Sequence, residues 1–490
     1  MASDCAQQPG AGGEMPGWEQ LVAHVRHGAE VRTHSGRVQS GDVFVALPGT
    51  RTDGASYIPH AVEKGAAWVV HSRQIRSQST PGVCFLAHPD VSAALGRLAR
   101  VRYGTDKLRP FLIGITGTNG KTTVSYMVEH LVHRAGKSCG VLGTINYRWQ
   151  DVEREASLTT PGCLELHAMV AQMAEDGVDV ACMEVSSHAL DQERTAGLEF
   201  DLTVFTNLTQ DHLDYHQDME AYFQSKSKLF SPFSCASVLN FDNPWGRRLA
   251  EVAAAGCGFS LTGDQVPGWP CLRGRIQHMD RTGQVLEMED PRIGTWTLRS
   301  ELAGRHNASN LLAAQAVGLE LGLGADHLKA LEDFSGPPGR LQRIEGPRGQ
   351  HVFVDYAHTP DALVNVLSAL KELDFDRLFV VFGCGGDRDP GKRPLMGEAV
   401  ARFADVAVLT SDNPRHEDPE QIMQAVLPGL AGCPRVVSEP DRRKAIQWAL
   451  RTIGPRDALL IAGKGHECTQ QIGDRKIPFR DEQVVVEYWT

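Results

Sequence analysis

The chain has 490 residues, more than one hydrophobic core usually organises, so we expect two to four domains. Hydrophobic residues make up 42% and charged residues 22%, a composition typical of a soluble globular protein, which excludes a disordered chain. The net charge of −11 argues against broad binding to nucleic acid, and no apolar run reaches the roughly 18–20 residues of a membrane span.

The cysteines favour a reducing compartment. All 11 are scattered without CxxC spacing, as expected of small core residues, and they indicate no zinc site. The first residues, "MASDCAQQPGAGGEMPG", have neither the basic nor the apolar segment of a secretory signal. We therefore expect a cytoplasmic protein, a monomer that acts on small molecules without nucleic-acid or membrane partners.

Three regions follow each other along the chain. Residues 1–107 alternate short β-like runs ("DVFVALPG", "AAWVVH") with helical patterns ("VSAALGRLARVRYG"), which predicts a small α/β domain. Residues 108–335 contain the apolar runs "FLIGIT", "VDVACME" and "FDLTVFTNL", each of which ends in polar residues. Such strands are buried on both faces of a parallel sheet, and their polar ends lie at its carboxyl edge, where α/β sheets bind ligands.

The Gly- and Pro-rich stretch "DFSGPPGRLQRIEG" marks the second boundary. In residues 336–490, strand-like runs are again followed by polar loops: "HVFVDYAHTP", "RLFVVFGCGGDRDPGKRP", "DVAVLTSDNPR" and "DALLIAGKGHE". This pattern predicts a second doubly wound sheet, with another row of loops at one edge.

The stretch Ile115–Thr123, "ITGTNGKTT", has most features of a phosphate-binding loop. Gly120, Lys121 and Thr122 fit the second half of the pattern G-x-x-x-x-G-K-[ST], but Ile115 occupies the place of the first glycine. A second glycine, Gly117, lies inside the loop.

Glycines permit positive φ, so successive backbone N–H groups can point at phosphate oxygens where the next helix begins. Lys121 would then reach the β- and γ-phosphates, and the Thr122 hydroxyl would bind Mg²⁺. The alternative is a Gly-rich turn without a ligand. An apolar strand before the loop and the apolar positions Val124 and Leu131 after it favour nucleotide binding.

Further motifs carry a resemblance to a known family. These are "TGTNGKTT", "LTTPG", "MEVSSHALDQER", "FTNLTQDHLDYHQDMEAYFQSKSKLF", "GRHNASNLLAA", "PPGRLQRIE", "VDYAHTPDAL", "GCGGDRDPGKRPLM", "DNPR" and "GKGHE". In this order they resemble the motifs of the Mur ligases, relatives of the folylpolyglutamate synthetases. They are most similar to the branch that joins meso-diaminopimelate to UDP-N-acetylmuramoyl-L-alanyl-D-glutamate in peptidoglycan synthesis.

The resemblance implies a three-domain α/β fold and an ATP-dependent, ADP-forming amide ligase. Residues 1–107 would bind the UDP-linked substrate, residues 108–335 would form the central P-loop ATPase-like domain, and residues 336–490 a Rossmann-like domain for the incoming amino acid. ATP would phosphorylate the D-glutamyl carboxylate, and the amine of diaminopimelate would attack the acyl phosphate. The resemblance also implies catalytic roles for Lys121 and Lys226.

Two Mg²⁺ ions are implied, with the ligands Thr122, Glu184, His212 and a carbamylated Lys226. An ammonium beside Mg²⁺ and ATP would repel the metal, whereas CO₂ capture gives N6-carboxylysine, an oxygen-bearing anion. The resemblance implies Lys226 rather than the nearby Lys228, because the spacing of Lys226 from "MEAY" matches that of the family's lysine. Without the resemblance, Glu184 is equally an acid paired with a basic neighbour, His212 a structural or surface histidine, and Lys226 a solvated surface charge.

The resemblance also assigns contacts with ATP and with the UDP-linked substrate. For ATP they are Gly117, Thr118, Asn119, Gly120, Lys121, Thr122, Thr123, Asn307, Asn310, Arg340 and Asp355, the last on the ribose hydroxyls. For the UDP-linked substrate they are Ser35, Thr50, Arg51, Thr52, Thr159, Thr160, Ser186, Gln192 and Arg194. The chain departs from the family at "HSGR", where "DSR" is usual, and at Leu158, where an Asn can occur. Taken alone, these Ser and Thr residues are equally turn and cap residues.

The "DNPR" motif, Asp412–Arg415, bears on which amino acid is added. Arg415 can bind the far carboxylate of diaminopimelate bidentately with help from Arg388, whereas the ammonium of lysine would be repelled. The expected contacts are Arg388, Asp412, Asn413, Pro414, Arg415, Gly463 and Glu467, with Glu467 attracting the ammonium of the reacting end. The alternatives are a lysine-adding ligase, a folylpolyglutamate-type ligase, or a nucleotide-binding regulator without ligase activity.

Overall fold

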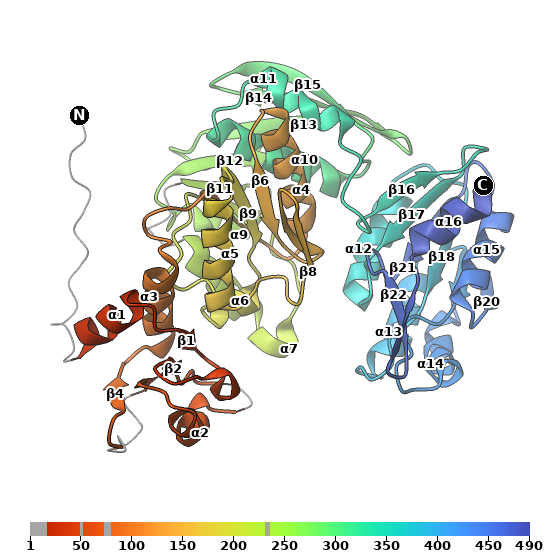
Figure 1. Ribbon diagram of the computed structural model, residues 1–490. Coiled ribbons are helices and arrows are strands. Elements are labelled where there is room, and N and C mark those ends of the chain that lie inside the picture. The colour runs from red at the N-terminus through yellow and green to blue at the C-terminus, as the bar shows by residue number, and fades with distance from the viewer. Residues whose placement is uncertain (1–16, 50–51, 73–79, 231–235) are drawn as a thin grey trace. The chain divides into compact units, whose positions relative to one another are not determined.

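The computed structural model describes residues 17–49, 52–72, 80–230 and 236–490 (Figure 1). These residues belong to two compact units. The first comprises residues up to 112 with 160–181 and 186–200, and the second comprises 113–159, 182–185 and 201–490. No helix in the described ranges combines the length and the apolar character needed to cross a membrane.

The first unit contains a four-stranded parallel sheet of β1 (Val31–Arg32), β2 (Val43–Val45), β3 (Trp68–His71) and β4 (Cys84–Ala87), in that order. Its helices are α1 (Trp18–Arg26), α2 (Ile58–Glu63), α3 (Val91–Tyr103), α5 (Cys163–Glu175), α6 (Ser187–Asp191) and the 3₁₀ turns η1 (Ser35–Arg37) and η2 (Gly54–Tyr57). Val43 and Val45 pack against α1 and α3, whereas Phe44, between them, packs against α2. Successive residues of a strand face opposite sides, so each face of this sheet has its own small core.

Most residues of an eleven-stranded sheet belong to the second unit, and its strand order is β15-β14-β13-β12-β11-β10-β5-β9-β6-β7-β8. The strands are β5 (Phe111–Thr116), β6 (Cys139–Leu142), β7 (Asn146–Trp149), β8 (Val152–Glu155), β9 (Val180–Glu184), β10 (Leu202–Phe205), β11 (Ala236–Asn240), β12 (Gly256–Ser260), β13 (Cys271–Asp280), β14 (Gly283–Asp290) and β15 (Gly294–Ser300). The accompanying helices are α4 (Lys121–Arg134), α7 (Leu213–His216), α8 (Met219–Ser227), α9 (Pro244–Leu249), α10 (Arg305–Glu320), α11 (Ala325–Leu328), η3 (Lys228–Phe230) and η4 (Lys329–Asp333).

Strand β10 pairs in parallel with both β5 and β11, and β9 and β10 are buried at every position. These strands are the continuous apolar runs of the sequence. The antiparallel strands β13–β15 and β6–β8 were not predicted. Strand β15 alternates exposed and buried residues, so one of its faces meets solvent and the strand lacks the continuous apolar signal.

The C-terminal part contains a six-stranded sheet in the order β16-β17-β21-β18-β19-β20 and a separate hairpin of β22 and β23 (Figure 1). The strands are β16 (Gln342–Glu345), β17 (His351–Asp355), β18 (Leu378–Phe382), β19 (Val406–Leu409), β20 (Val436–Ser438), β21 (Ala458–Ala462), β22 (Thr469–Ile472) and β23 (Arg475–Pro478). The helices are α12 (Pro360–Lys371), α13 (Lys392–Ala401), α14 (Pro419–Val426), α15 (Arg442–Thr452), α16 (Asp481–Trp489) and η5 (Leu427–Leu430).

Helices cover both faces of this six-stranded sheet. Val380 and Phe382 of β18 pack with residues of α12, α13 and α14, whereas Phe379 and Val381 of the same strand pack with α15 and α16. Apart from antiparallel β16, the strands pair in parallel. The predicted α/β fold with a second doubly wound sheet is therefore confirmed. The domain boundaries at residues 107 and 335 stay a prediction.

Candidate active site

The phosphate-binding loop lies between β5, which ends at Thr116, and α4, which begins at Lys121. Its two glycines have positive φ, 150° at Gly117 and 86° at Gly120. A Cβ at Gly117 would collide with the Thr206 hydroxyl, and one at Gly120 with the Asn310 amide. Both positions therefore favour glycine for their conformation, Gly117 also requires it for space, and a Cβ at Gly120 would displace the Asn310 side chain.

The end of the neighbouring strand β10 holds this loop in place. The Thr206 hydroxyl donates to the Asn119 carbonyl oxygen at 2.6 Å, and the Asn207 side chain binds the Asn119 N–H and carbonyl at 3.0 and 3.1 Å. The Thr118 N–H donates to the Asn207 carbonyl at 2.8 Å. Since β5 and β10 are adjacent parallel strands, their ends meet at one edge of the sheet.

Two lysines converge on one carbonyl oxygen of the loop. Lys121 Nζ donates to the Gly117 oxygen at 2.9 Å and to the Thr118 oxygen at 2.9 Å, and Lys226 Nζ donates to the same Gly117 oxygen at 3.0 Å. Burial lowers the pKa of Lys121. The pKa of Lys226 is well below its ordinary value, first because of burial and then because of the charge on Lys121.

Lys226 lies in the last turn of α8, a helix capped by Asp218, whose carboxylate accepts the Ala221 N–H. Its side chain is 1% exposed and lies 4.6 Å from the ring centre of Tyr222. The alternative of a solvated surface lysine is therefore wrong for Lys226, whereas Lys228 is exposed. The structure thus gives a physical reason to distinguish the two lysines.

Tyr222 connects several of the predicted residues. Its hydroxyl lies 3.2 Å from Thr118 Oγ1, and its ring stacks on His216 at 5.0 Å and meets the edge of His212 at 6.1 Å. His212 has φ 52°, precedes α7, and lies 3.6 Å from the Asp211 carboxylate. The sequence interpretation did not assign Tyr222, although the "MEAY" motif contains it.

Glu184, at the end of β9, accepts hydrogen bonds from Thr122, the second residue of α4, and from Thr144, which follows β6. The Thr122 hydroxyl donates to Oε2 at 3.0 Å, the Thr144 hydroxyl to Oε2 at 2.9 Å, and the Thr144 N–H to Oε1 at 2.9 Å. This carboxylate and the two hydroxyls form a donor set of hard oxygens that suits Mg²⁺. In the described part of the chain, no three His, Cys, Asp or Glu side chains gather as a metal site. Thr144 was not predicted.

The predicted ATP contacts divide into residues at the loop and residues farther along the chain. Asn310 lies beside Gly120, and Asn307 donates to the Ala303 carbonyl at 2.9 Å. Arg340 lies over the Tyr356 ring at 5.1 Å. The Asp355 carboxylate accepts the N–H groups of Leu341 and Ala357, both at 2.7 Å, and burial raises its pKa. Asp355 therefore also fixes the chain where the C-terminal sheet begins.

The predicted contacts to the UDP-linked substrate form separate groups. Thr160 Oγ1 accepts the Ser186 N–H at 3.0 Å, and Arg194 donates to the Thr160 carbonyl at 2.9 Å and to the Gln192 side chain. Ser35 is buried and lies 3.0 Å from Nδ1 of His60, a residue that was not predicted.

In the second unit, Thr159 lies 3.2 Å from Thr144. Thr52 is exposed, and Thr50 and Arg51 lie outside the described residues.

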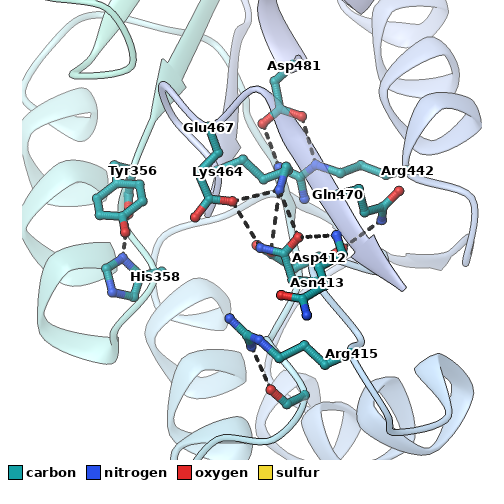
Figure 2. Close-up of polar contacts among 12 residues, drawn as sticks. Tyr356, His358, Asp412, Asn413, Arg415, Arg442, Lys464, Glu467, Gln470 and Asp481 are labelled. Carbon is teal, nitrogen blue, oxygen red and sulfur yellow. Dashed lines mark hydrogen bonds and ion pairs between the residues drawn. The ribbon is translucent and has the colours of Figure 1, made fainter. Parts of the chain in front are cut away.

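Figure 2 shows the loops at the edge of the C-terminal sheet, where residues predicted to bind the amino acid meet. Asn413, after β19, donates to Glu467 Oε2 at 2.9 Å, and the buried Lys464 donates to the same oxygen at 2.8 Å. Burial on its own would raise the pKa of Glu467, but the charge and hydrogen bond of Lys464 lower it below the ordinary value. Lys464 was not assigned a role from the sequence.

Arg415 has φ 50°, and its Nη1 donates to the Gly386 carbonyl at 2.6 Å, while Arg388 of the neighbouring loop is exposed. Asp412 is buried, and its carboxylate lies against Gly463, where φ is 116° and a Cβ would collide. Burial raises the pKa of Asp412, although Arg442 and Lys464 act in the opposite direction. The structure therefore brings the "DNPR", "GGDR" and "GKGHE" loops to one edge.

Comparison with known proteins agrees with this geometry. Family models match residues 29–103 (Mur ligase family, catalytic domain), 115–318 (Mur ligase middle domain) and 339–465 (Mur ligase, glutamate ligase domain). A relative from Lawsonia intracellularis (strain PHE/MN1-00) is named UDP-N-acetylmuramoyl-L-alanyl-D-glutamate–2,6-diaminopimelate ligase. It is 52% identical over 456 residues, which are 92% of this chain and 94% of the relative.

Solved structures extend the comparison. One described as UDP-N-acetylmuramoyl-L-alanyl-D-glutamate–2,6-diaminopimelate ligase is 34% identical, with a TM-score of 0.66 over 94% of each chain. The Mycobacterium tuberculosis folylpolyglutamate synthase complexed with ADP is 22% identical, with a TM-score of 0.59 over 77% of this chain and 92% of that chain, and shares the fold.

A glycine-requiring phosphate loop at the carboxyl edge of a parallel sheet, with a lysine and a carboxylate beside it, defines an ATP-using α/β enzyme. The chain belongs to the Mur ligase family. The predicted class of ATP-dependent, ADP-forming ligase is thereby confirmed. The roles of individual residues stay predictions.

Proposed function

We propose that this chain joins meso-diaminopimelate to UDP-N-acetylmuramoyl-L-alanyl-D-glutamate in peptidoglycan synthesis, using ATP. Relatives 52% and 42% identical, from Lawsonia intracellularis and Synechococcus elongatus, bear the name of that ligase. The observation that supports the choice of amino acid is the placement of Arg415 at the same sheet edge as Asn413 and Glu467.

In the proposed reaction, the D-glutamyl carboxylate attacks the γ-phosphoryl group of ATP and forms an acyl phosphate with release of ADP. The amine of diaminopimelate then attacks the acyl carbon, inorganic phosphate leaves, and the amine proton is lost as the amide forms. Lys121 and the loop N–H groups would stabilise the charge on the transferring phosphoryl group. Exclusion of water would protect the acyl phosphate from hydrolysis.

Thr122 and Glu184, with His212 and a modified Lys226, would hold two Mg²⁺ ions, which neutralise phosphate charge when bound. The hydrogen bond of 3.0 Å between Thr122 and Glu184 supports this donor set, because both groups offer hard oxygens at the phosphate loop.

The buried position of Lys226 and its lowered pKa support the proposed modification. Burial and the charge on Lys121 favour the neutral amine. A neutral amine attacks CO₂: a nitrogen–carbon bond forms, the nitrogen loses one proton, and the neutral amine becomes a carbamate anion. Such an anion adds oxygen donors where Lys121 already supplies positive charge.

Selectivity for diaminopimelate would come from the guanidinium groups of Arg415 and Arg388. They can pair with the far carboxylate, whereas the ammonium of L-lysine would face like charge. Glu467 would attract the ammonium of the reacting end. The proposal includes a cytoplasmic location, which the free thiols of the nine described cysteines support.

The test is phosphate release by purified protein with ATP, Mg²⁺, the UDP-linked dipeptide and either diaminopimelate or L-lysine. We expect release with diaminopimelate and at least about tenfold lower kcat/KM with lysine, a difference of about 1.4 kcal/mol. Efficient use of lysine with poor use of diaminopimelate would overturn the assignment. A folylpolyglutamate-type ligase would instead require a folate substrate and glutamate.

A further inference from the structure

Lys464 lies at the centre of the polar network in Figure 2, although none of the roles above was assigned to it. Its side chain is 0% exposed. Its Nζ donates to Glu467 Oε2 at 2.8 Å and to Asn413 Oδ1 at 3.1 Å, and it lies 4.0 Å from Asp412 Oδ1. The ammonium therefore contacts side chains from two loops, the one after β19 and its own after β21.

The contacts of Asn413 fix the orientation of its amide. Oδ1 accepts from Lys464 Nζ at 3.1 Å and from the Gln471 N–H at 2.9 Å, so two donors face this atom. The amide nitrogen consequently points to Glu467 Oε2, to which it donates at 2.9 Å. With a reversed amide, the side-chain NH₂ would face an ammonium and a backbone N–H.

Glu467 is oriented by the same ammonium. Both Lys464 and Asn413 donate to Oε2, and within the described residues no hydrogen bond reaches Oε1. The Glu467 side chain is 33% exposed, whereas Lys464 is enclosed behind it. This arrangement leaves Glu467 Oε1 available to an incoming ammonium, while the buried Lys464 ammonium stays on the Oε2 side of the carboxylate.

A buried ion pair fixes the backbone close to Lys464. Arg442 of α15 and Asp481 of α16 are both 0% exposed and pair at 2.7 Å, and Arg442 also donates to the Ala462 carbonyl at 3.0 Å. Ala462 is the last residue of β21, two positions before Lys464. The hydrogen bond from Arg442 to the Ala462 carbonyl thus fixes the backbone that carries Lys464, so the Lys464 ammonium has a defined position.

We propose that Lys464 is a positioning residue that sets the geometry of Asn413 and Glu467 for the amino end of the incoming amino acid. The proposal rests on the proposed function, because it concerns the site at which the amino acid reacts. Lys464 acts through its two partners and makes no contact with the substrate. Removing its charge should weaken use of the amino acid without changing use of ATP or of the UDP-linked dipeptide.

The test compares wild type, Lys464→Met and the control Lys476→Met, which removes an exposed lysine on β23. We expect Lys464→Met to raise the KM for diaminopimelate at least tenfold, with the KM for ATP and for the UDP-linked dipeptide changed less than twofold. Lys476→Met should match wild type. An unchanged KM for diaminopimelate, or an equal rise in all three KM values, would overturn the proposal.

The pH profile separates positioning from a general loss of structure. Charged and titratable groups around Glu467 are Lys464, His466, Asp412, Tyr356 and Arg442. Since Lys464 lowers the pKa of Glu467, its removal should move the acid limb of kcat/KM for diaminopimelate to higher pH. An acid limb at the wild-type pH would contradict this role.

A double-mutant cycle tests whether Lys464 acts through Glu467. In a Glu467→Gln background, adding Lys464→Met should change kcat/KM less than threefold, and fully multiplicative effects would count against the proposal. If Lys464→Met does not fold, as judged by circular dichroism, Lys464→Arg takes its place. Lys464→Arg should raise only the KM for diaminopimelate, because a planar guanidinium cannot reproduce the contacts of the ammonium with both Glu467 and Asn413. A KM equal to that of wild type would overturn the proposal.

Turnover by the wild-type protein distinguishes failure of the proposed function from failure of the positioning role. Absence of turnover with diaminopimelate contradicts the proposed function, whereas normal turnover with an unaffected Lys464→Met contradicts only the positioning role. If wild type uses L-lysine instead, the same comparison is made with L-lysine, because both amino acids share the reacting end.

Discussion

Lys121 and Lys226 donate to the same carbonyl oxygen of Gly117, at 2.9 and 3.0 Å. Two ammonium groups so close together repel each other, and burial penalises both charges. The pair is relieved when Lys226 is neutral, and relieved further when Lys226 becomes an anion. This relationship gives the proposed carbamylation a physical cause in the chain itself.

Replacing Lys226 by Ala should lower kcat at least about 100-fold, the size of effect seen when one charge-stabilising group is lost. Short carboxylic acids added to the assay should restore part of the activity, because they can supply the missing oxygens. The control is Lys228→Ala, which removes an exposed lysine two residues away and should leave the rate unchanged. Full activity of Lys226→Ala would contradict the role.

The carbamate itself should depend on pH. Because burial and the charge on Lys121 lower the pKa of Lys226, a larger fraction of its amine is neutral near pH 7–8 than for a surface lysine, and that fraction grows as pH rises. We expect a carbamate carbon resonance in protein equilibrated with ¹³C-bicarbonate, stronger at pH 8 than at pH 6. It should be absent from Lys226→Ala, and its absence from wild type at pH 8 would refute the modification.

Gly120 and Gly136 flank α4 and provide a matched pair of substitutions. Both have positive φ, 86° and 76°, but a Cβ at Gly120 would collide with Asn310 whereas Gly136 faces open space. Gly136→Ala should cost only the strain of left-handed backbone, about 1 kcal/mol of unfolding free energy. Gly120→Ala should in addition weaken ATP binding at least about tenfold, about 1.4 kcal/mol, as measured by calorimetry. Equal ATP affinity in the two variants would show that the loop tolerates the collision.

Arg415→Ala should raise the KM for diaminopimelate about 100-fold, because the far carboxylate loses a charged partner worth several kcal/mol. It should also reduce the preference for diaminopimelate over L-lysine by at least about tenfold, since the repulsion of lysine is removed together with the attraction. Arg475→Ala, at an exposed position of β23, is the control. Unchanged selectivity would place the carboxylate elsewhere.

Arg442 and Arg443 are neighbours in sequence but differ in burial. The Arg442–Asp481 pair is 0% exposed on both sides, whereas Arg443 and Glu487 are 45% and 44% exposed. Arg442→Met should therefore cost about 3–5 kcal/mol of unfolding free energy, because it leaves Asp481 buried without its cation. Arg443→Met should cost no more than about 1 kcal/mol. Urea denaturation measures both, and similar losses would contradict this difference.

Much of the fold could be predicted because buried parallel strands are continuous apolar runs. Strands such as Phe111–Thr116 and Leu378–Phe382 are recognisable without any partner, and their polar ends lead to the site loops. The antiparallel strands from Cys271 to Ser300 were missed, because alternation on a half-exposed face is a weaker signal.

The site was predicted as a set of motifs and not as a set of contacts. The sequence did not predict four residues whose hydrogen-bond partners lie far away in the chain: Tyr222, Thr144, His60 and Lys464. The burial of Lys226 also had no local signal, since the preceding residues of α8 mix polar and apolar types. These contacts and the burial of Lys226 are determined by tertiary packing, which short sequence patterns do not encode.

The anchoring of Ala462 by Arg442 has a practical consequence for handling the molecule. Asp481, the counter-charge of Arg442, is the first residue of the last helix, α16, so after a protease cut between Gly473 and Arg480 only noncovalent contacts would hold this carboxylate beside Arg442. Preparations nicked there should lose amino-acid incorporation while still binding ATP, and purification tags are better attached before the first strand than close to Thr490.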